Sequence, residues 1–168
     1  MISLRRLKTE DAAGMLEWLN DFEISQYFTF AHRTHDKDAV LRFIQEAQES
    51  EDHRHYAIVD EHDEYLGTIS LKNIDCSNGH AEYAIAIRKS NHGRGIGQTA
   101  SRLVLEVAKD ELHLHKVYLN VLTSNAAAIH LYEKLGFKQK GLFQDHVLKQ
   151  DGYHDLYYYE IIFNEDAP

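Results

Sequence analysis

The sequence has 168 residues, a formal net charge of -9 with neutral histidines, and apolar residues at 43% of its positions. A chain of this length can bury one core, so we expect residues 1–168 to form a single domain. The charge excludes nucleic acid as the main partner, because phosphate binding needs clustered Lys and Arg. It is compatible with a cationic substrate, although most acidic proteins are simply soluble.

Cysteine usage and hydropathy bear on where the chain works. The single cysteine, Cys76, cannot form an intramolecular disulfide, which favours a reducing compartment. The chain opens without a signal-peptide pattern, and no apolar run approaches the roughly 20 residues of a membrane span. We therefore expect a cytoplasmic protein with no membrane partner.

The first third of the chain predicts one strand followed by helices. Residues 2–7 alternate apolar and polar side chains, which predicts a short strand. Helical spacing then appears in two places, and a loop or short helix carrying several aromatic residues lies between them. The spaced residues are Ala12, Met15, Leu16 and Leu19, and then Val40, Phe43, Ile44 and Ala47.

Three strands follow, at about residues 56–60, 65–74 and 80–88. Polar turns join them, so an antiparallel meander is the simplest arrangement. A strong apolar stripe over residues 100–112 predicts a helix, and residues 117–122 predict a strand.

A second helix covers residues 128–135 and ends at Gly136, where a left-handed cap is expected. The turn Asp151-Gly152 joins two last strands at about 138–148 and 154–163. The order of elements predicts an α/β (α+β) fold with a mixed sheet, in which the strand–helix–strand unit over 82–122 is parallel and right-handed.

A glycine-rich segment, His92-Gly93-Arg94-Gly95-Ile96-Gly97, lies where a strand leads into the strong helix. Glycines at alternate positions let the backbone approach a ligand closely. The first amides of the helix have no internal partners and, with the helix dipole, form an anion site suited to a diphosphate.

Two other phosphate motifs do not fit this segment. A nucleotide P-loop would require Lys after the last glycine, where the sequence has Gln98-Thr99. The dinucleotide fingerprint has a different glycine spacing. A tight strand-to-helix turn without a ligand stays the alternative at this point.

A second segment, residues 120–137, extends the case. With the glycine-rich segment it resembles the GNAT superfamily of N-acetyltransferases, in both motifs, in their order and in their separation. The first family motif is Q/R-x-x-G-x-G/A, and the second is matched by Asn125, Tyr132, Gly136 and Phe137. The likeness covers essentially the whole chain and points to the branch of ribosomal-protein alanine and spermidine acetyltransferases. One departure is His92, where the family usually has Arg or Gln, which bears on cofactor affinity.

The resemblance implies a mixed, mostly antiparallel seven-stranded sheet flanked by about four helices. It also implies acetyl-CoA as co-substrate, with the strand along the pantetheine, the glycine-rich turn around the diphosphate, and the second motif near the thioester. The implied cofactor residues are Ile85, Ala86, Ile87, His92, Gly93, Arg94, Gly95, Ile96, Gly97, Gln98, Asn125, Ala127 and Tyr132.

Amide formation from a thioester needs a neutral amine, a stabilised oxyanion and a proton for the leaving thiolate. The resemblance places Tyr132 beside the sulfur as general acid, whereas periodicity alone favours a packed aromatic. Glu82 shares a strand face with Ala84 and Ala86 and is the candidate base, through a water. A solvent-facing carboxylate is the alternative for Glu82. A backbone N–H around residues 85–87 would hold the oxyanion.

The acceptor side is weakly marked. Trp18, Tyr27, Phe28 and Tyr158 are candidate substrate-binding residues, although aromatic residues of this kind are more often core or interface. The stretch 27–33 lacks the acidic pair of spermidine enzymes in this branch, which lowers the polyamine interpretation. Paired histidines at 53/55 and 113/115 lack a third ligand, so no metal site is expected.

We therefore expect an acetyl-CoA-dependent N-acetyltransferase whose acceptor is a peptide N-terminus or a small-molecule amine. Homodimers are common in the superfamily, so a second copy of the chain is a candidate partner. The alternative is a non-catalytic acyl-CoA binding or sensing module on the same fold, which would bind the thioester without consuming it.

Overall fold

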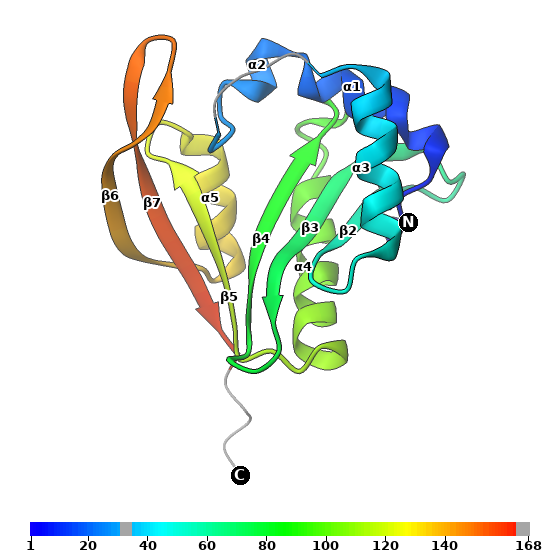
Figure 1. Ribbon diagram of the computed structural model, residues 1–168. Helices are drawn as coiled ribbons and strands as arrows, with labels where there is room; N and C mark the ends of the chain where they lie inside the picture. The colour runs from blue at the N-terminus through cyan, green and yellow to red at the C-terminus, as the bar shows by residue number, and fades with distance from the viewer. Residues whose placement is uncertain (31–34, 164–168) are drawn as a thin grey trace.

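The structure is a computed structural model that describes residues 1–30 and 35–163. A seven-stranded sheet lies between two layers of helices (Figure 1). The strands are β1 (Ser3–Arg6), β2 (Arg54–Val59), β3 (Tyr65–Asp75), β4 (His80–Ile87), β5 (Lys116–Leu122), β6 (Lys138–Lys149) and β7 (Gly152–Ile162). The helices are α1 (Ala12–Leu19), α2 (Phe22–Ser25), α3 (Lys37–Glu49), α4 (Ile96–Glu106) and α5 (Ala126–Leu135).

The sheet has the order β1-β2-β3-β4-β5-β7-β6 and is antiparallel except for the pair β4–β5. The predicted meander of β2, β3 and β4 is confirmed, and so is the parallel unit that runs from β4 through α4 to β5. The C-terminal hairpin β6–β7 is also as predicted, with its turn at residues 150–151, directly before Gly152.

The parallel pair is short and the two strands then separate. Pairing joins residues 80–82 of β4 to residues 116–118 of β5 and goes no further. Beyond it β4 continues against β3 as far as Ile87, while β5 continues against β7 as far as Leu122. Figure 1 shows the two strands meeting at one end and diverging toward α1 and α2. The sheet is therefore split along one seam, the line between β4 and β5.

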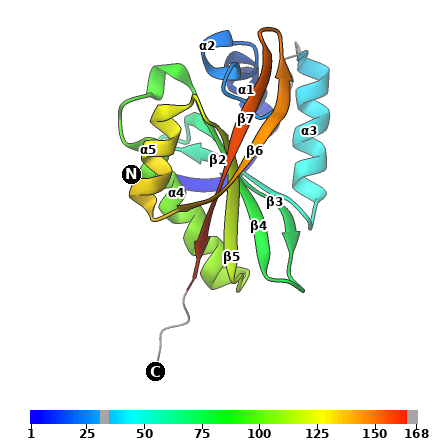
Figure 2. The same cartoon turned by 90° about the vertical axis from the view of Figure 1, so that its left-hand side faces the viewer.

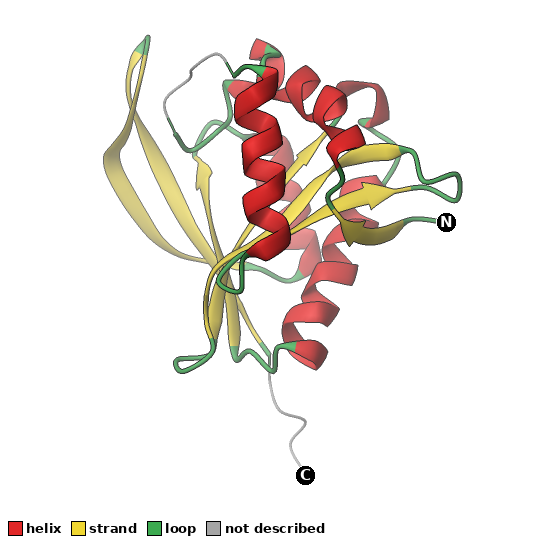
Figure 3. Cartoon of the chain, turned by 45° about the vertical axis from the view of Figure 1, so that its right-hand side comes forward, coloured by secondary structure: helices red, strands yellow, loops and turns green. Residues whose placement is uncertain are grey.

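Each face of the sheet has its own core. Viewed along the sheet, α3 lies on one side and α4 and α5 lie on the other (Figure 2), and α3 stands in front of the sheet in Figure 3. The α4/α5 side buries Ile69, Tyr83, Val104 and Val117, among others. The α1/α3 side buries Met15, Ile44 and Ala57 with their neighbours.

The helices differ from the sequence prediction in two respects. The described residues form five α-helices where about four were expected, because the aromatic segment after α1 includes the four-residue helix α2. The stripe over 100–112 is not one regular helix: α4 ends at Glu106 and a π-turn follows, in which the Leu112 N–H donates to the Val107 carbonyl (3.0 Å). Of the helices described, none is long and apolar enough to span a membrane.

Candidate active site

A cleft of about 800 Å³ lies at the split between β4 and β5 and is lined by residues from both faces of the sheet. Its walls come from the glycine-rich turn, the upper part of β4, the start of α5, and the aromatic segment after α2. The predicted residues that line it are Glu82, Ile85, Ala86, Ile87, His92, Gly93, Gly95, Ile96, Gly97, Asn125, Ala127, Tyr132, Trp18, Tyr27 and Phe28.

The glycine-rich turn presents bare backbone to this cleft. Gly93 and Gly95 adopt φ values of 75° and 74°, which side-chain-bearing residues rarely adopt, and a Cβ built at either would meet no atom within 4 Å. The first bond of α4 runs from the Thr99 N–H to the Gly95 carbonyl (3.2 Å), so the preceding amides have no helical partner. In the described chain, the amides of residues 93–95 donate to no backbone carbonyl. This cradle fits a diphosphate.

The free edge of β4 adds a second set of backbone groups. The Arg88 N–H donates to the Leu66 carbonyl of β3 (2.9 Å), and backbone direction alternates along a strand. The N–H and C=O groups of Ile85 and Ile87 therefore face β5, where pairing has stopped. Of the strand amides predicted to include the oxyanion donor, those of Ile85 and Ile87 thus face the cleft, whereas the Ala86 amide points toward β3.

His92, the departure from the family motif, has a definite position. Its Nε2 lies 2.8 Å from the Ile87 carbonyl, so this nitrogen carries the hydrogen and donates it. The contact ties the start of the glycine-rich turn to the end of β4 and satisfies one of the free carbonyls of that edge. The side chain therefore has a structural role in the turn, with the ring exposed at the rim of the cleft.

Tyr132 lies on α5 and is 8% exposed. Its ring packs edge-on against Tyr83, with centroids 5.6 Å apart, while the residue lines the cleft. No side chain or backbone group of the described residues hydrogen-bonds its hydroxyl. Burial raises the pKa of Tyr132 well above its ordinary value, so the hydroxyl keeps its proton at neutral and alkaline pH.

The ends of α5 explain why Tyr132 is held there. Asn125 caps the helix with its Oδ1, which accepts from the Ala128 N–H at 3.3 Å. Gly136 ends it with φ 101°, the left-handed cap predicted from the sequence. The two motif residues therefore set the length and direction of the helix that carries the tyrosine.

Glu82 lines the cleft on the α3 face together with Ala84 and Ala86, as strand alternation predicts. It is not the isolated acid that the sequence suggested: its Oε2 lies 2.9 Å from Lys72 Nζ on the neighbouring strand. The register pairs Lys72 directly with Glu82, so the partner follows from sheet topology. The two side chains are 35% and 22% exposed and form an ion pair in the wall of the cleft.

Asn120 is a cleft residue that sequence reasoning missed. It lies on β5 opposite Tyr158 of β7, and its Oδ1 is buried without a hydrogen-bond partner among the described residues. A buried acceptor without a donor costs stability, so it indicates a ligand or water that supplies one. Alternation along 116–122 puts Asn120 on the polar side of that strand, which is the signal that could have identified it.

The candidate substrate-binding residues differ in whether they line the cleft or pack elsewhere. Phe28 packs edge-on to Trp18 at 5.7 Å and stacks on Phe30 at 5.0 Å, which builds an aromatic wall. The Trp18 indole N–H donates to the Tyr65 hydroxyl (2.8 Å), so Trp18 is largely part of the α1 core. Tyr158 stacks on Tyr118 and is not among the residues that line the cleft. Residues 31–33 of the aromatic stretch lie outside the described part.

Two other predicted residues and the single cysteine lie outside the cleft lining. Arg94 is not among the residues that line the cleft, and its guanidinium donates to Oδ1 of the lining residue Asn91 at 3.0 Å. Gln98 is likewise outside the cleft lining, in the first turn of α4. Cys76 is exposed in the turn after β3, away from the cleft.

The histidine pairs show other partners. The rings of His53 and His55 are 5.9 Å apart, and His55 Nδ1 lies 2.6 Å from Ser70 Oγ. Burial lowers the pKa of His55 to about 4, so its ring is neutral at physiological pH. Over residues 1–30 and 35–163, no three metal-ligating side chains gather in one place.

Comparison with known proteins agrees with this geometry. Residues 2–138 match the model of the acetyltransferase (GNAT) domain. The chain is 25% identical over 169 residues to the uncharacterized N-acetyltransferase p20 of Bacillus licheniformis, covering 99% of this chain and 95% of that protein. It is 26% identical over 155 residues to the spermidine N(1)-acetyltransferase of Vibrio cholerae, covering 92% and 89%.

A solved structure is also similar throughout. The crystal structure of spermidine N-acetyltransferase from Vibrio cholerae in complex with CoA and spermine superimposes with a TM-score of 0.89 at 25% identity, covering 96% of this chain and 95% of that one. The backbone cradle, the free edge of β4 and the motif residues of α5 therefore lie on a fold that holds CoA in a relative. The chain belongs to the GNAT family and is an acetyl-CoA-dependent N-acetyltransferase.

Proposed function

We propose that this enzyme transfers the acetyl group by direct attack of a primary amine across the β4–β5 split, with Tyr132 as general acid and Glu82 as the group that accepts the amine proton. One observation carries the proposal: the cleft at the split has the buried Tyr132 hydroxyl on the α5 side of the sheet and the Glu82 carboxylate on the α3 side. The thioester and the amine can thus approach from opposite faces of the sheet.

The grip on acetyl-CoA comes from this chain's backbone. The amides of residues 93–98 would hold the diphosphate. The N–H and C=O of Ile85 and the N–H of Ile87 would pair with the pantetheine in the manner of an added strand. An amide of the same edge, at Ile85 or Ile87, is the proposed oxyanion donor. Asn125 and Ala127 border the cleft where α5 begins.

The chemical step balances without a covalent enzyme intermediate. The amine nitrogen attacks the thioester carbonyl, a C–N bond forms, and the C–S bond breaks. The amine proton passes to Glu82, directly or through a water, and the Tyr132 hydroxyl gives a proton to the departing thiolate. Because Tyr132 is buried and neutral, it is a donor and not a base in this scheme.

The acceptor is proposed to be a small-molecule amine or a peptide N-terminus. The relatives named above include spermidine acetyltransferases, but the carboxylates that line this cleft are paired with lysines. The aromatic wall of Phe28 and Phe30 would cover the non-polar part of the acceptor.

We further propose that the chain works in the cytoplasm as a homodimer. The exposed thiol of Cys76 suits a reducing compartment. The hairpin β6–β7 carries large apolar side chains in solvent, namely Leu142, Phe143, Leu148 and Tyr153, which would be covered by a second copy.

Two measurements test the proposal in sequence. Calorimetry with acetyl-CoA should detect binding, and release of the free CoA thiol should then appear when amines, amino acids and peptides are added. Tight binding with no thiol released by any acceptor would instead support the non-catalytic sensing module. Absence of binding would overturn the assignment of the glycine-rich turn.

A further inference from the structure

The acceptor arm is the part of the cleft on the α3 face of the sheet, formed by His55, Ser70, Lys72, Glu82, Ala84 and Asn120. Its charges are unusual for a site that would take a polycation. Of the described residues that line the whole cleft, Glu23 and Glu82 carry carboxylates. Each has an ammonium partner, Lys89 for Glu23 and Lys72 for Glu82.

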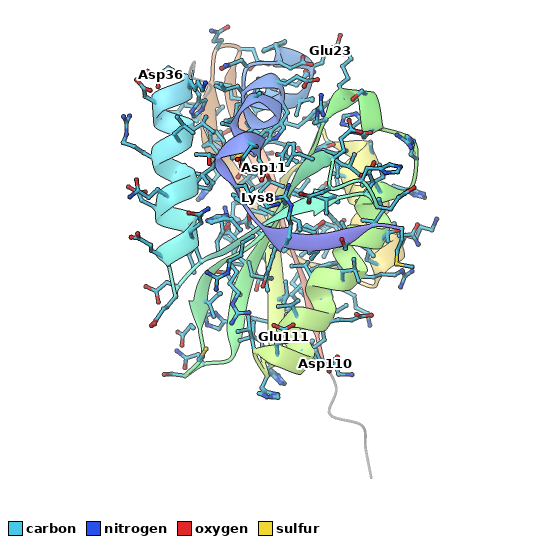
Figure 4. All side chains as sticks on the ribbon, turned by 90° about the vertical axis from the view of Figure 1, so that its right-hand side faces the viewer. Lys8, Asp11, Glu23, Asp36, Asp110 and Glu111 are labelled. Carbon is cyan, nitrogen blue, oxygen red and sulfur yellow. The ribbon has the colours of Figure 1, made fainter. Side chains whose placement is uncertain are left out.

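The two ion pairs lie in different surroundings. Glu23 lies on α2 at the rim, where Figure 4 shows it at the outer end of the molecule, and its side chain is 67% exposed. Glu82 lies on a central strand and is 22% exposed. Solvent screens the outer pair, whereas the inner pair keeps more of its electrostatic effect on a bound acceptor.

Lys72 supplies the positive charge of the arm. It is the one lysine among the described lining residues, and no arginine is among them. His55, its neighbour on β2, is neutral because burial lowers its pKa to about 4, and its Nδ1 is already on Ser70. An ammonium has three donors, and the pair with Glu82 uses one of them, so Lys72 can hold a second anionic group.

We propose that Lys72 is a specificity residue and that the acceptor is an amino-carboxylate, an amine that carries an anionic group a few bonds away. The inference rests on the proposed function. The Lys72–Glu82 pair is a fixed dipole in the wall of the arm, and a zwitterion pairs with it head to tail: the carboxylate meets the Lys72 ammonium and the amine meets Glu82. For a polyamine this arm is unfavourable, because the Glu82 carboxylate is already neutralised and the Lys72 ammonium beside it repels the positive charge of the polyamine.

The wild-type enzyme tests the class of acceptor through matched substrates. Free L-amino acids and their carboxamides differ in one charge, so each pair should differ in kcat/KM by about tenfold or more in favour of the free acid. Spermidine should be a poorer acceptor than the best free amino acid. Equal values within every pair, or spermidine as the best acceptor, would overturn the inference while leaving the acetyltransferase assignment intact.

Variants test the residue. Lys72→Met should lower the ratio of kcat/KM for the free acid to kcat/KM for the carboxamide to about one. It should also raise kcat/KM for spermidine about fivefold, since the charge of Glu82 then has no lysine partner. Lys72→Arg should restore part of the preference. Lys8→Met is the matched control. Lys8 follows the edge strand β1, and its Nζ lies 2.8 Å from Asp63 (Figure 4), so its loss should leave the preference for free acids over carboxamides unchanged.

Acetyl-CoA affinity separates loss of folding from loss of selectivity. Each variant should bind acetyl-CoA as the wild type does, because the arm lies on the opposite face of the sheet from the glycine-rich turn. A Lys72→Met enzyme that binds acetyl-CoA normally and still prefers free acids over carboxamides would show that another group holds the carboxylate. No thiol release from any acceptor by the wild type would be a failure of the proposed function and not of this inference alone.

Discussion

The two halves of the β4–β5 seam use the same two strands for different purposes. In the paired half, residues 80–82 bond to residues 116–118, and the adjoining side chains Ala81 and Val117 are fully buried. In the split half, Ile85 and Ile87 turn backbone groups toward a cleft and not toward a partner strand. The paired half is held by burial and a complete hydrogen-bond ladder, whereas the split half leaves main-chain groups to be satisfied from outside.

This difference explains where the chemistry belongs. Buried backbone N–H and C=O groups are nearly always paired, so an edge inside a sheet is costly unless water or a ligand completes it. The buried Oδ1 of Asn120, which has no partner among the described residues, also lies in the split half of the seam. The paired half also contains one such side-chain atom, the Nδ1 of His80, but its two strands pair with each other along residues 80–82 and 116–118. Changes in the split half should therefore affect ligand handling, and changes in the paired half should affect stability.

The largest effect is expected at Tyr132. Tyr132→Phe removes the proposed proton donor without removing the ring, so kcat should fall about a thousandfold while acetyl-CoA affinity stays nearly constant. Because burial raises the pKa of Tyr132, the wild-type rate should show no loss of this acid at pH values up to about 10. Steady-state kinetics from pH 6 to 10 checks both statements.

Tyr83 offers a matched control for that variant. It is a buried neighbour in ring contact with Tyr132, but its hydroxyl bonds to Ser101 Oγ (2.7 Å) behind the glycine-rich turn. Tyr83→Phe should cost about 1 kcal/mol of stability and keep most of the turnover. Similar losses of kcat in both variants would remove Tyr132 as the specific acid.

The second effect concerns the diphosphate cradle. Gly95→Leu adds a side chain where α4 begins and strains a residue at φ 74°, so acetyl-CoA should bind about a hundredfold more weakly. Gly152→Leu introduces a comparable strain at φ 119° in the β6–β7 turn, also in open space. Calorimetry should find wild-type affinity in the Gly152 variant, and equal weakening in both would mean that strain and not phosphate contact is responsible.

The third effect lies in the paired half. Val117→Ala removes two buried methyl groups from the core beneath α4 and should lower the free energy of unfolding by about 2 kcal/mol. Its acetyl-CoA affinity and kcat should match the wild type at a temperature where both are folded. Urea denaturation together with kinetics gives the two quantities. A large change in affinity would contradict the division of the seam.

The smallest effect is expected at Asn120. Asn120→Leu replaces an unsatisfied buried acceptor by an apolar side chain of similar size, so stability should be unchanged or higher by about 1 kcal/mol. The acceptor KM should rise by about tenfold with little change in acetyl-CoA affinity, if Oδ1 accepts a hydrogen bond from the amine. A variant that is less stable, with an unchanged acceptor KM, would show that a structural water holds Asn120 instead.

Much of the fold could be read from local signals. Alternation marked the strands, the apolar stripe marked α4, and Gly136 and Asp151-Gly152 marked a helix end and a hairpin, because each depends on a few adjacent residues. The glycine-rich turn and the residues of α5 were recognisable for the same reason. The helix boundary at Glu106 was not, because the π-turn depends on how the chain packs before β5.

The acceptor side depended on contacts between segments distant in the sequence. In the sequence Glu82 looked like a lone acid, because its partner Lys72 lies on the preceding strand β3. The register of β3 and β4 places the two residues opposite each other. Asn120 lies where β5 no longer pairs with β4 and pairs only with β7, and there its Oδ1 is buried without a hydrogen-bond partner among the described residues.

The sequence by itself thus determined most of the elements and the anion cradle, since local backbone conformation and capping create them. It indicated the reaction class through the resemblance of its two motifs to the GNAT superfamily. Tertiary structure alone decided where the sheet divides, which carboxylates pair with lysines and which buried polar atoms lack a partner. Those properties arise from strand pairing and burial, which no single segment of the chain contains.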